Sequence, residues 1–65
     1  MNFQEVGETI LVTTPGPSGA INCGQIRRVG RWWVYEPMAG VHLTAGQMGA
    51  IASRLVKENS TRNEA

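Results

Sequence analysis

The sequence has little of several residue types, and each shortage removes a class of function. It holds one cysteine, Cys23, and one histidine, His42, so it forms neither an internal disulfide framework nor a zinc site with four Cys or His ligands. The single thiol favours a reducing compartment. No stretch approaches the roughly 20 apolar residues of a membrane-spanning helix, and the N-terminus lacks the pattern of a secretory signal. We therefore expect a cytoplasmic protein.

Charge of either sign is also scarce. The formal net charge is +1, so no field of the whole molecule attracts nucleic acid, membrane or an acidic substrate. The five acidic residues are all glutamates, and none form a pair spaced for acid–base catalysis. Cys23 sits in a strand pattern and His42 between two apolar residues, which predicts a buried structural thiol and an exposed imidazole. We expect no catalysis, no cofactor and no metal.

What the sequence does contain is enough for one small folded unit. The chain is 42% hydrophobic, which is more apolar than a disordered chain. Its 65 residues are too few for two domains. Residues 1–58 carry the periodic patterns of a domain. Residues 59–65 are polar and lack periodicity, so they are predicted to form a flexible tail.

The first two thirds of the chain follow a strand pattern. Residues 8–14, 20–29 and 32–36 are rich in β-branched or aromatic residues, and Pro and Gly clusters separate them. Residues 3–6 add a candidate edge strand with Gly7 as a bulge or kink, and residues 41–43 follow a further turn as a short last strand. This spacing predicts a sheet of three or four antiparallel strands.

Gly30 places a tight hairpin in this sheet. A type II′ turn at Gly30 and Arg31 accepts glycine at its first central position, whereas a turn one residue earlier would require a positive φ from Val29. The Gly30 turn fixes the register of four pairs: Val29 with Trp32, Arg28 with Trp33, Arg27 with Val34, and Ile26 with Tyr35.

A helical period begins after residue 43. Thr44 and Gln47 form a capping box that starts a helix at Ala45, and the helix is expected to fade near Asn59. Its apolar positions form one stripe, expected to face the sheet: Met48, Ile51, Ala52, Leu55 and Val56. Gly49 borders this stripe, and its missing side chain would leave room for Trp32; the alternative is that the glycine has no packing role and the fold tolerates its cost. The predicted fold is α+β, with an antiparallel sheet and one C-terminal amphipathic helix packed on one face; the alternative is a small SH3-like barrel plus helix.

The hairpin concentrates aromatic and basic residues on both of its faces, and one helix covers only one face. Because Val29, Trp32 and Val34 include two β-branched residues, we assign their face to the core. The opposite face is then open. It carries the predicted partner-binding residues: Ile26, Arg28, Trp33 and Tyr35, with Arg31 in the turn. The alternative is that Trp33 and Tyr35 pack under the N-terminal segment around Phe3, or inside a closed barrel, and serve stability alone.

This composition predicts a non-enzymatic binding module. Trp, Tyr and Arg are enriched in the energetic centres of protein interfaces, so the first hypothesis is docking on a protein partner or on a second copy. Such a role suits an accessory or inhibitor protein of a mobile element. The alternative is a nucleic-acid-binding protein, in which the arginines contact phosphates and Trp33 and Tyr35 stack on bases. No membrane or small-molecule partner is indicated.

Overall fold

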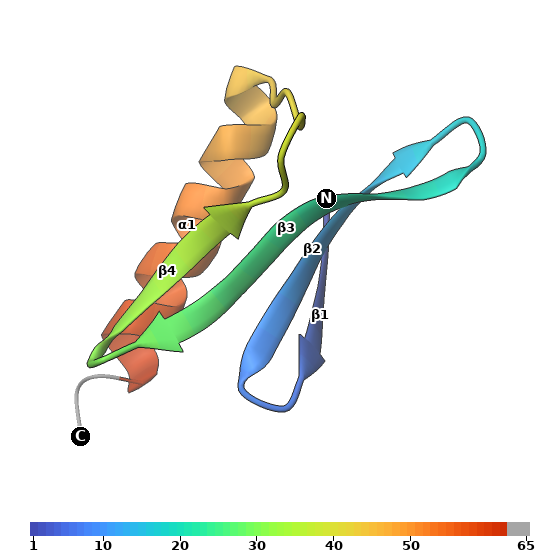
Figure 1. Ribbon diagram of the computed structural model, residues 1–65. Coiled ribbons are helices and arrows are strands. Elements are labelled where there is room, and N and C mark those ends of the chain that lie inside the picture. The colour runs from blue at the N-terminus through green and yellow to red at the C-terminus, as the bar shows by residue number, and fades with distance from the viewer. Residues whose placement is uncertain (63–65) are drawn as a thin grey trace.

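Four strands pair in the order in which they occur along the chain. The computed structural model describes the backbone of residues 1–62 and the side chains of residues 1–60. The strands are β1 (Asn2–Val6), β2 (Thr9–Gly16), β3 (Gly19–Val29) and β4 (Trp32–Pro37), and they form one antiparallel sheet of order β1-β2-β3-β4. β1 and β4 are its edges, and the sheet is open (Figure 1). The predicted α+β fold is confirmed, and the barrel alternative is wrong.

The hairpin between β3 and β4 has the predicted register. Val29 pairs with Trp32 and Ile26 pairs with Tyr35. Gly30 has a φ of 63°, and no other residue type among the described residues has a positive φ. Since a type I′ turn would also need a positive φ at Arg31, the angles fit the type II′ turn.

The sheet contains one β-bulge, and it lies in β3. Val12 pairs with Gly24 but Thr13 pairs with Asn22, so Cys23 is an extra residue without a partner on β2. At the bulge, Gly24 has a φ of 122°, and a Cβ there would lie 2.2 Å from the carbonyl oxygen of Glu36. Only glycine allows β3 and β4 to approach this closely.

Two local predictions in the strand region are wrong. Gly7, expected to form a bulge, instead has a φ of 62° in the turn that joins β1 to β2. Residues 41–43, expected to form a last strand, have no regular secondary structure. They connect β4 to the helix, and the Val41 amide donates to the Met38 carbonyl at 3.2 Å to close a turn.

The helix α1 (Ala45–Arg62) begins where the capping box predicts. The Thr44 amide donates to Oε1 of Gln47 at 2.8 Å, and the Gln47 amide donates to Oγ1 of Thr44 at 3.2 Å. The helix includes residues 59–62, which we expected in the polar tail, whereas residues 63–65 lie outside the described part of the chain. Among the described residues, no helix combines the length and the apolar character needed to cross a membrane.

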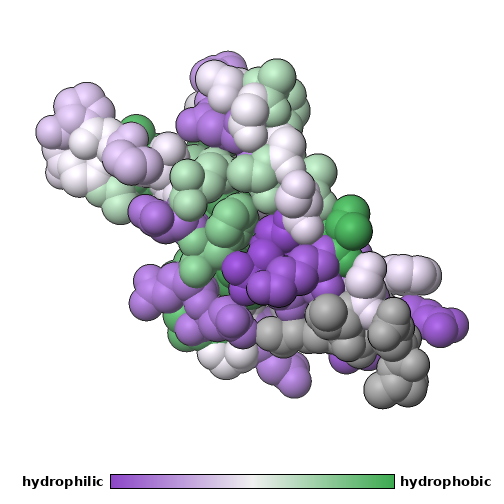
Figure 2. All heavy atoms as spheres, turned by 180° about the vertical axis from the view of Figure 1, so that it is seen from behind, coloured by the Kyte–Doolittle hydropathy of each residue, from purple (hydrophilic) through white to green (hydrophobic). Residues whose placement is uncertain are grey.

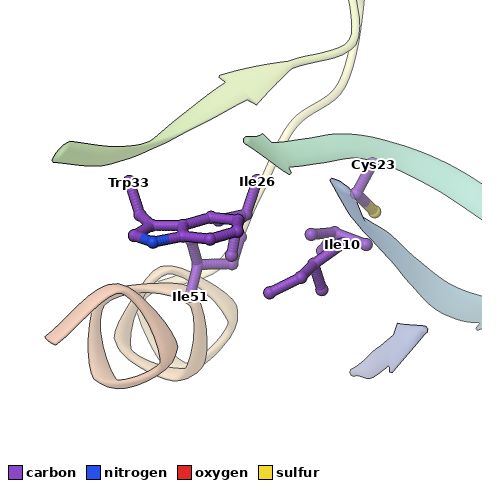
Figure 3. Packing of buried hydrophobic residues seen from close by; sticks show 6 residues of the cluster. Ile10, Cys23, Ile26, Trp33 and Ile51 are labelled. Carbon is purple, nitrogen blue, oxygen red and sulfur yellow. The ribbon is translucent and has the colours of Figure 1, made fainter. Parts of the chain in front are cut away.

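The core lies between one face of the sheet and α1. It consists of six buried residues: Ile10, Val12, Cys23, Ile26, Trp33 and Ile51. Figure 3 shows the Trp33 ring extending from β4 toward α1, close to Ile26 and Ile51. α1 runs alongside β4 and packs mainly against it, while the β2–β3 hairpin projects beyond the helix (Figure 1). The molecule is therefore elongated, at 41 × 24 × 18 Å.

Polar contacts fasten the C-terminal half of α1 to the sheet. Asn59 hydrogen-bonds to the backbone of Trp33 on β4. Arg54 contacts Glu58 at 2.9 Å and Glu5 of β1 at 3.5 Å, and its guanidinium lies 5.5 Å from the centre of the Phe3 ring. The side of α1 that faces the sheet is thus partly polar.

Candidate binding face of the sheet

The face of the sheet turned away from α1, here called the outer face, is the candidate site. Side chains alternate between the two faces of a strand, and directly paired residues share a face. The registers therefore place residues from all four strands on the outer face, and they include Val6, Thr9, Leu11, Gln25, Arg27, Val29, Trp32, Val34 and Glu36. Among them, Val6, Leu11, Val29 and Trp32 are large apolar side chains that stay exposed.

Trp32 is the most exposed aromatic residue of this face. Its side chain is 56% exposed, and its strand partner Val29 is 48% exposed. The guanidinium of Arg31, in the hairpin turn, lies 6.0 Å from the centre of the Trp32 ring. This distance is at the limit of a cation–π contact. The hairpin end thus presents a large aromatic surface with a cation beside it.

An ion pair crosses the outer face from β3 to β4. Nε of Arg27 lies 2.6 Å from Oε1 of Glu36, and Nε2 of Gln25 donates to the same oxygen at 3.0 Å. These hydrogen bonds, first from Arg27 and then from Gln25, lower the pKa of the Glu36 carboxyl. The hydrogen bond with Glu36 in turn raises the pKa of Arg27. The two charges cancel, so the centre of the outer face is close to neutral.

The structure contradicts our assignment of the two faces. Trp33 is only 4% exposed and Ile26 is fully buried, both against α1, whereas Trp32 and Val29 face solvent. Trp33 and Ile26 are therefore core residues rather than members of an exposed patch. The physical reason is that α1 packs against the ring of Trp33 through Ile51 (Figure 3). Trp32 points to the other face of β4, where α1 does not cover it.

The remaining predicted site residues are separated by the structure. Tyr35 is half-buried on the helix side, where its hydroxyl donates to the carbonyl of Cys23. Burial raises the pKa of this hydroxyl, with a smaller contribution from Cys23. Arg28 is exposed, and its Nε donates to the Gly30 carbonyl at 3.0 Å. Of the predicted set, Arg31 is the residue that lies beside the outer face.

The bulge in β3 explains why the alternation was misleading. Counted along a regular strand, Cys23 falls on the face of Val29 and opposite to Ile26. The extra residue in β3 changes this count, so that Cys23 and Ile26 are buried together. Gly24, next to the buried thiol, was the available signal for a bulge. With the bulge included in the count, the apolar residues Cys23 and Ile26 would fall on the same face of β3 and would indicate the correct core face.

Sequence reasoning missed Trp32, Arg27 and Glu36 as members of the exposed face. The prediction of a buried Cys23 is confirmed, since its side chain is 1% exposed. His42 is exposed, as expected, although it lies in the connection to α1 rather than in a strand. Gly49 does not receive Trp32, because no described atom beyond the neighbouring helix backbone lies within 4 Å of where its Cβ would be.

Comparisons with known proteins leave the function to be argued from the site itself. We found no significant match to a protein-family model, to a curated protein or to a solved structure.

Proposed function

We propose that this chain is a non-enzymatic module that docks onto a protein partner through the outer face of its sheet. The observation that carries the proposal is the exposure of Trp32 next to Val29, on a face that α1 does not cover. Exposed apolar side chains that gather on one face mark interaction surfaces. A module of this kind acts by occupying a larger target, as expected of an accessory or inhibitor protein.

The chemistry of the outer face supports a protein partner. Tryptophan and arginine are the residues most enriched among those that dominate binding energy, and here Trp32 lies between Arg31 and the Arg27–Glu36 pair. Because that ion pair is neutral overall, the apolar residues rather than net charge would provide most of the affinity. We propose that this role is cytoplasmic, and the support for this is that the chain has one cysteine, Cys23, and no pair to form an internal disulfide.

The test is a capture experiment with the purified chain at moderate and at high salt. A partner bound through the outer face is captured by the wild type and lost with Trp32→Ser, while the fold, followed by circular dichroism, is unchanged. The control is Ser53→Ala, an exposed position on α1, which retains the partner. Capture that is insensitive to Trp32→Ser would contradict the proposal.

A second candidate function is binding of single-stranded nucleic acid, favoured by the arginines at the hairpin end. Arg31 lies beside the exposed Trp32 ring, and Arg28 is exposed two residues before Gly30, on the face of Trp33. An exposed aromatic ring beside a cation suits base stacking with a phosphate contact. Titration with a short single-stranded oligonucleotide would then change the tryptophan fluorescence, with affinity that falls steeply with salt. A Trp32→Phe variant shows whether Trp32 is the reporter.

A further inference from the structure

Apolar surface is exposed on both sides of the molecule. On α1 the predicted apolar stripe does not pack against the sheet as a whole, contrary to our prediction: Ile51 is buried, but Met48 is 54% exposed and Val56 is 64% exposed. Figure 2, which views the molecule from behind, shows hydrophobic surface open to solvent in its upper half and the largest hydrophilic patch below it. The outer face differs from the helix because a pocket and an unpaired charge accompany its apolar residues, and these indicate what it binds.

The pocket of the outer face lies beside the β-bulge. Side chains on one face of a regular strand follow one another at every second residue. Cys23, the extra residue of the bulge, is turned into the core, so the outer-face residues on either side of it, Asn22 and Gln25, are three residues apart. The bulge thus leaves a gap in the row of outer side chains. A pocket of about 310 Å³ lies there, and both residues line it.

The walls of this pocket are partly apolar. Leu11 is 36% exposed and Met38 is 45% exposed, and both line the pocket together with Pro37. Glu36 lines it too, but its charge is compensated by Arg27 at 2.6 Å. An apolar cavity of about 150 Å³ holds a benzene-sized group, so this pocket has room for one apolar side chain of a partner.

Arg31 provides an uncompensated positive charge at the hairpin end of the outer face. Its guanidinium lies 6.0 Å from the centre of the Trp32 ring, and within the part of the chain that the structure describes it forms no ion pair. Glu8 lies in the β1–β2 turn, and β3 separates that hairpin from β4. Two strand spacings are about 10 Å, so Glu8 compensates the charge of Arg31 only weakly.

We infer that the outer face binds an extended segment of its protein partner that carries an apolar side chain for the pocket and a carboxylate for Arg31. This inference rests on the proposed function and adds the chemistry of the partner. Glu36 at the pocket and Trp32 at the hairpin end are four residues apart on β4, which is about 13 Å. Because an extended segment presents every second side chain to one side, its apolar and acidic residues should be four positions apart.

The remaining charges favour a protein segment over nucleic acid. Tight contact with a phosphate backbone takes several cations. Arg27 is paired with Glu36, and Arg28 shares the face of Trp33, on the helix side of the sheet. One cation beside an apolar pocket therefore complements one carboxylate with an apolar residue nearby, rather than a row of phosphates.

The first test selects peptides from a random library displayed on phage, with the immobilised full chain as the bait. The recovered sequences should carry Asp or Glu four positions from Leu, Met or Phe, in either order, and they should be lost on Trp32→Ser. Sequences that depend on Trp32 but lack the acidic residue overturn the inference and leave the proposed function standing. Recovery of no shared sequence, or of the same sequences on Trp32→Ser, also overturns the inference.

The second test exchanges the charges across the contact. The probe is a fluorescein-labelled synthetic peptide with leucine and glutamate four positions apart, followed by fluorescence polarisation. Arg31→Glu should weaken its binding about tenfold, and the same peptide with lysine in place of glutamate should bind Arg31→Glu more tightly than the wild type. Lys57→Glu, at an exposed position of α1, makes the same change of net charge and should bind the glutamate peptide as the wild type does. Equal effects of Arg31→Glu and Lys57→Glu overturn the inference.

The third test addresses the pocket and the class of partner. Leu11→Thr should weaken binding of the glutamate peptide, whereas Val56→Thr on α1 should not; both positions are exposed, so circular dichroism should show an unchanged fold. Equal binding by Leu11→Thr and the wild type overturns the role of the pocket. Labelled oligothymidylate is the competing probe. If it binds more tightly than the peptide, with affinity that falls steeply with salt, the inference is overturned in favour of nucleic acid.

Discussion

The side-chain amide of Asn59 forms two hydrogen bonds with the backbone of Trp33. The Trp33 amide donates to Oδ1 of Asn59 at 2.8 Å, and Nδ2 of Asn59 donates to the Trp33 carbonyl at 3.2 Å. β4 is an edge strand, so these backbone groups would otherwise be open to pairing with another chain. The side chain of Asn59 thus provides hydrogen-bond partners for the backbone amide and carbonyl of Trp33 on this edge strand, and the ring of the same residue lies in the core.

Replacing Asn59 with alanine should destabilise the protein measurably. Two hydrogen bonds at about 1 kcal/mol each give an expected loss of about 2 kcal/mol in the free energy of unfolding, measured by urea denaturation. Asn59→Asp should also lower the free energy of unfolding, because it keeps an acceptor for the Trp33 amide but loses the donor to the Trp33 carbonyl. The control is Ser60→Ala, at the next and exposed position. Equal stability of Asn59→Ala and Ser60→Ala would show that the contact contributes little.

The two adjacent tryptophans should differ strongly in their contribution to stability. Trp33→Ala removes a ring that is 4% exposed and should cost about 3–5 kcal/mol, enough to unfold a domain of this size. Trp33→Phe retains part of the packing and keeps the effect measurable if the alanine variant is unfolded. Trp32→Ala loses the cross-strand contact with Val29 and the exposed contact with Arg31, and it should cost less than about 1 kcal/mol. A larger cost at Trp32 than at Trp33 would contradict the core described above.

Gly24 should be the least replaceable glycine of the sheet. Gly30→Ala places alanine at a positive φ in open space, which costs about 1–2 kcal/mol. Gly24→Ala adds a steric overlap with the Glu36 carbonyl, so its cost should be larger by about 1–3 kcal/mol. Thermal unfolding of both variants tests this order. The reverse order would mean that β3 and β4 separate easily at the bulge.

Tyr35 should make stability depend on pH in the alkaline range. Burial raises the pKa of its hydroxyl in the folded state above the ordinary value of 10.0. The resulting stabilisation is present below pH 10 and is lost as the pH rises through the folded pKa. Tyr35→Phe removes the hydrogen bond to the Cys23 carbonyl, so its free energy of unfolding at neutral pH should be lower by about 1 kcal/mol. Because phenylalanine does not ionise, the stability of this variant should not fall further in the alkaline range through this group.

The titration of Tyr35 can be followed directly, since it is the single tyrosine of the chain. Its ultraviolet absorbance change should have a midpoint above that of the urea-unfolded protein. A midpoint equal to the unfolded value would show that the hydroxyl is solvated rather than bound to the Cys23 carbonyl.

The local structure could be predicted from the sequence because short-range chemistry determines it. Gly30 specified the β3–β4 turn and its register, and Thr44 with Gln47 specified the first residue of α1. Each of these signals acts within a few residues, where backbone geometry and one hydrogen bond decide the conformation.

The face of the sheet that becomes buried could not be predicted in the same way. Both faces of the hairpin carry a tryptophan, and the choice depends on where a distant helix attaches, through Asn59 and Ile51. The orientation of α1 was missed for the same reason, because Glu58 and Asn59 find partners that only the tertiary structure supplies. The predicted binding residues therefore separated between core and surface, and the exposed tryptophan proved to be Trp32.

The order of the strands has a consequence for the speed of folding. Each strand pairs with the one beside it in the chain, and α1 packs mainly on the strand that precedes it. Few long loops must close before native pairs form, and low contact order gives short folding times. Stopped-flow refolding should therefore finish within milliseconds.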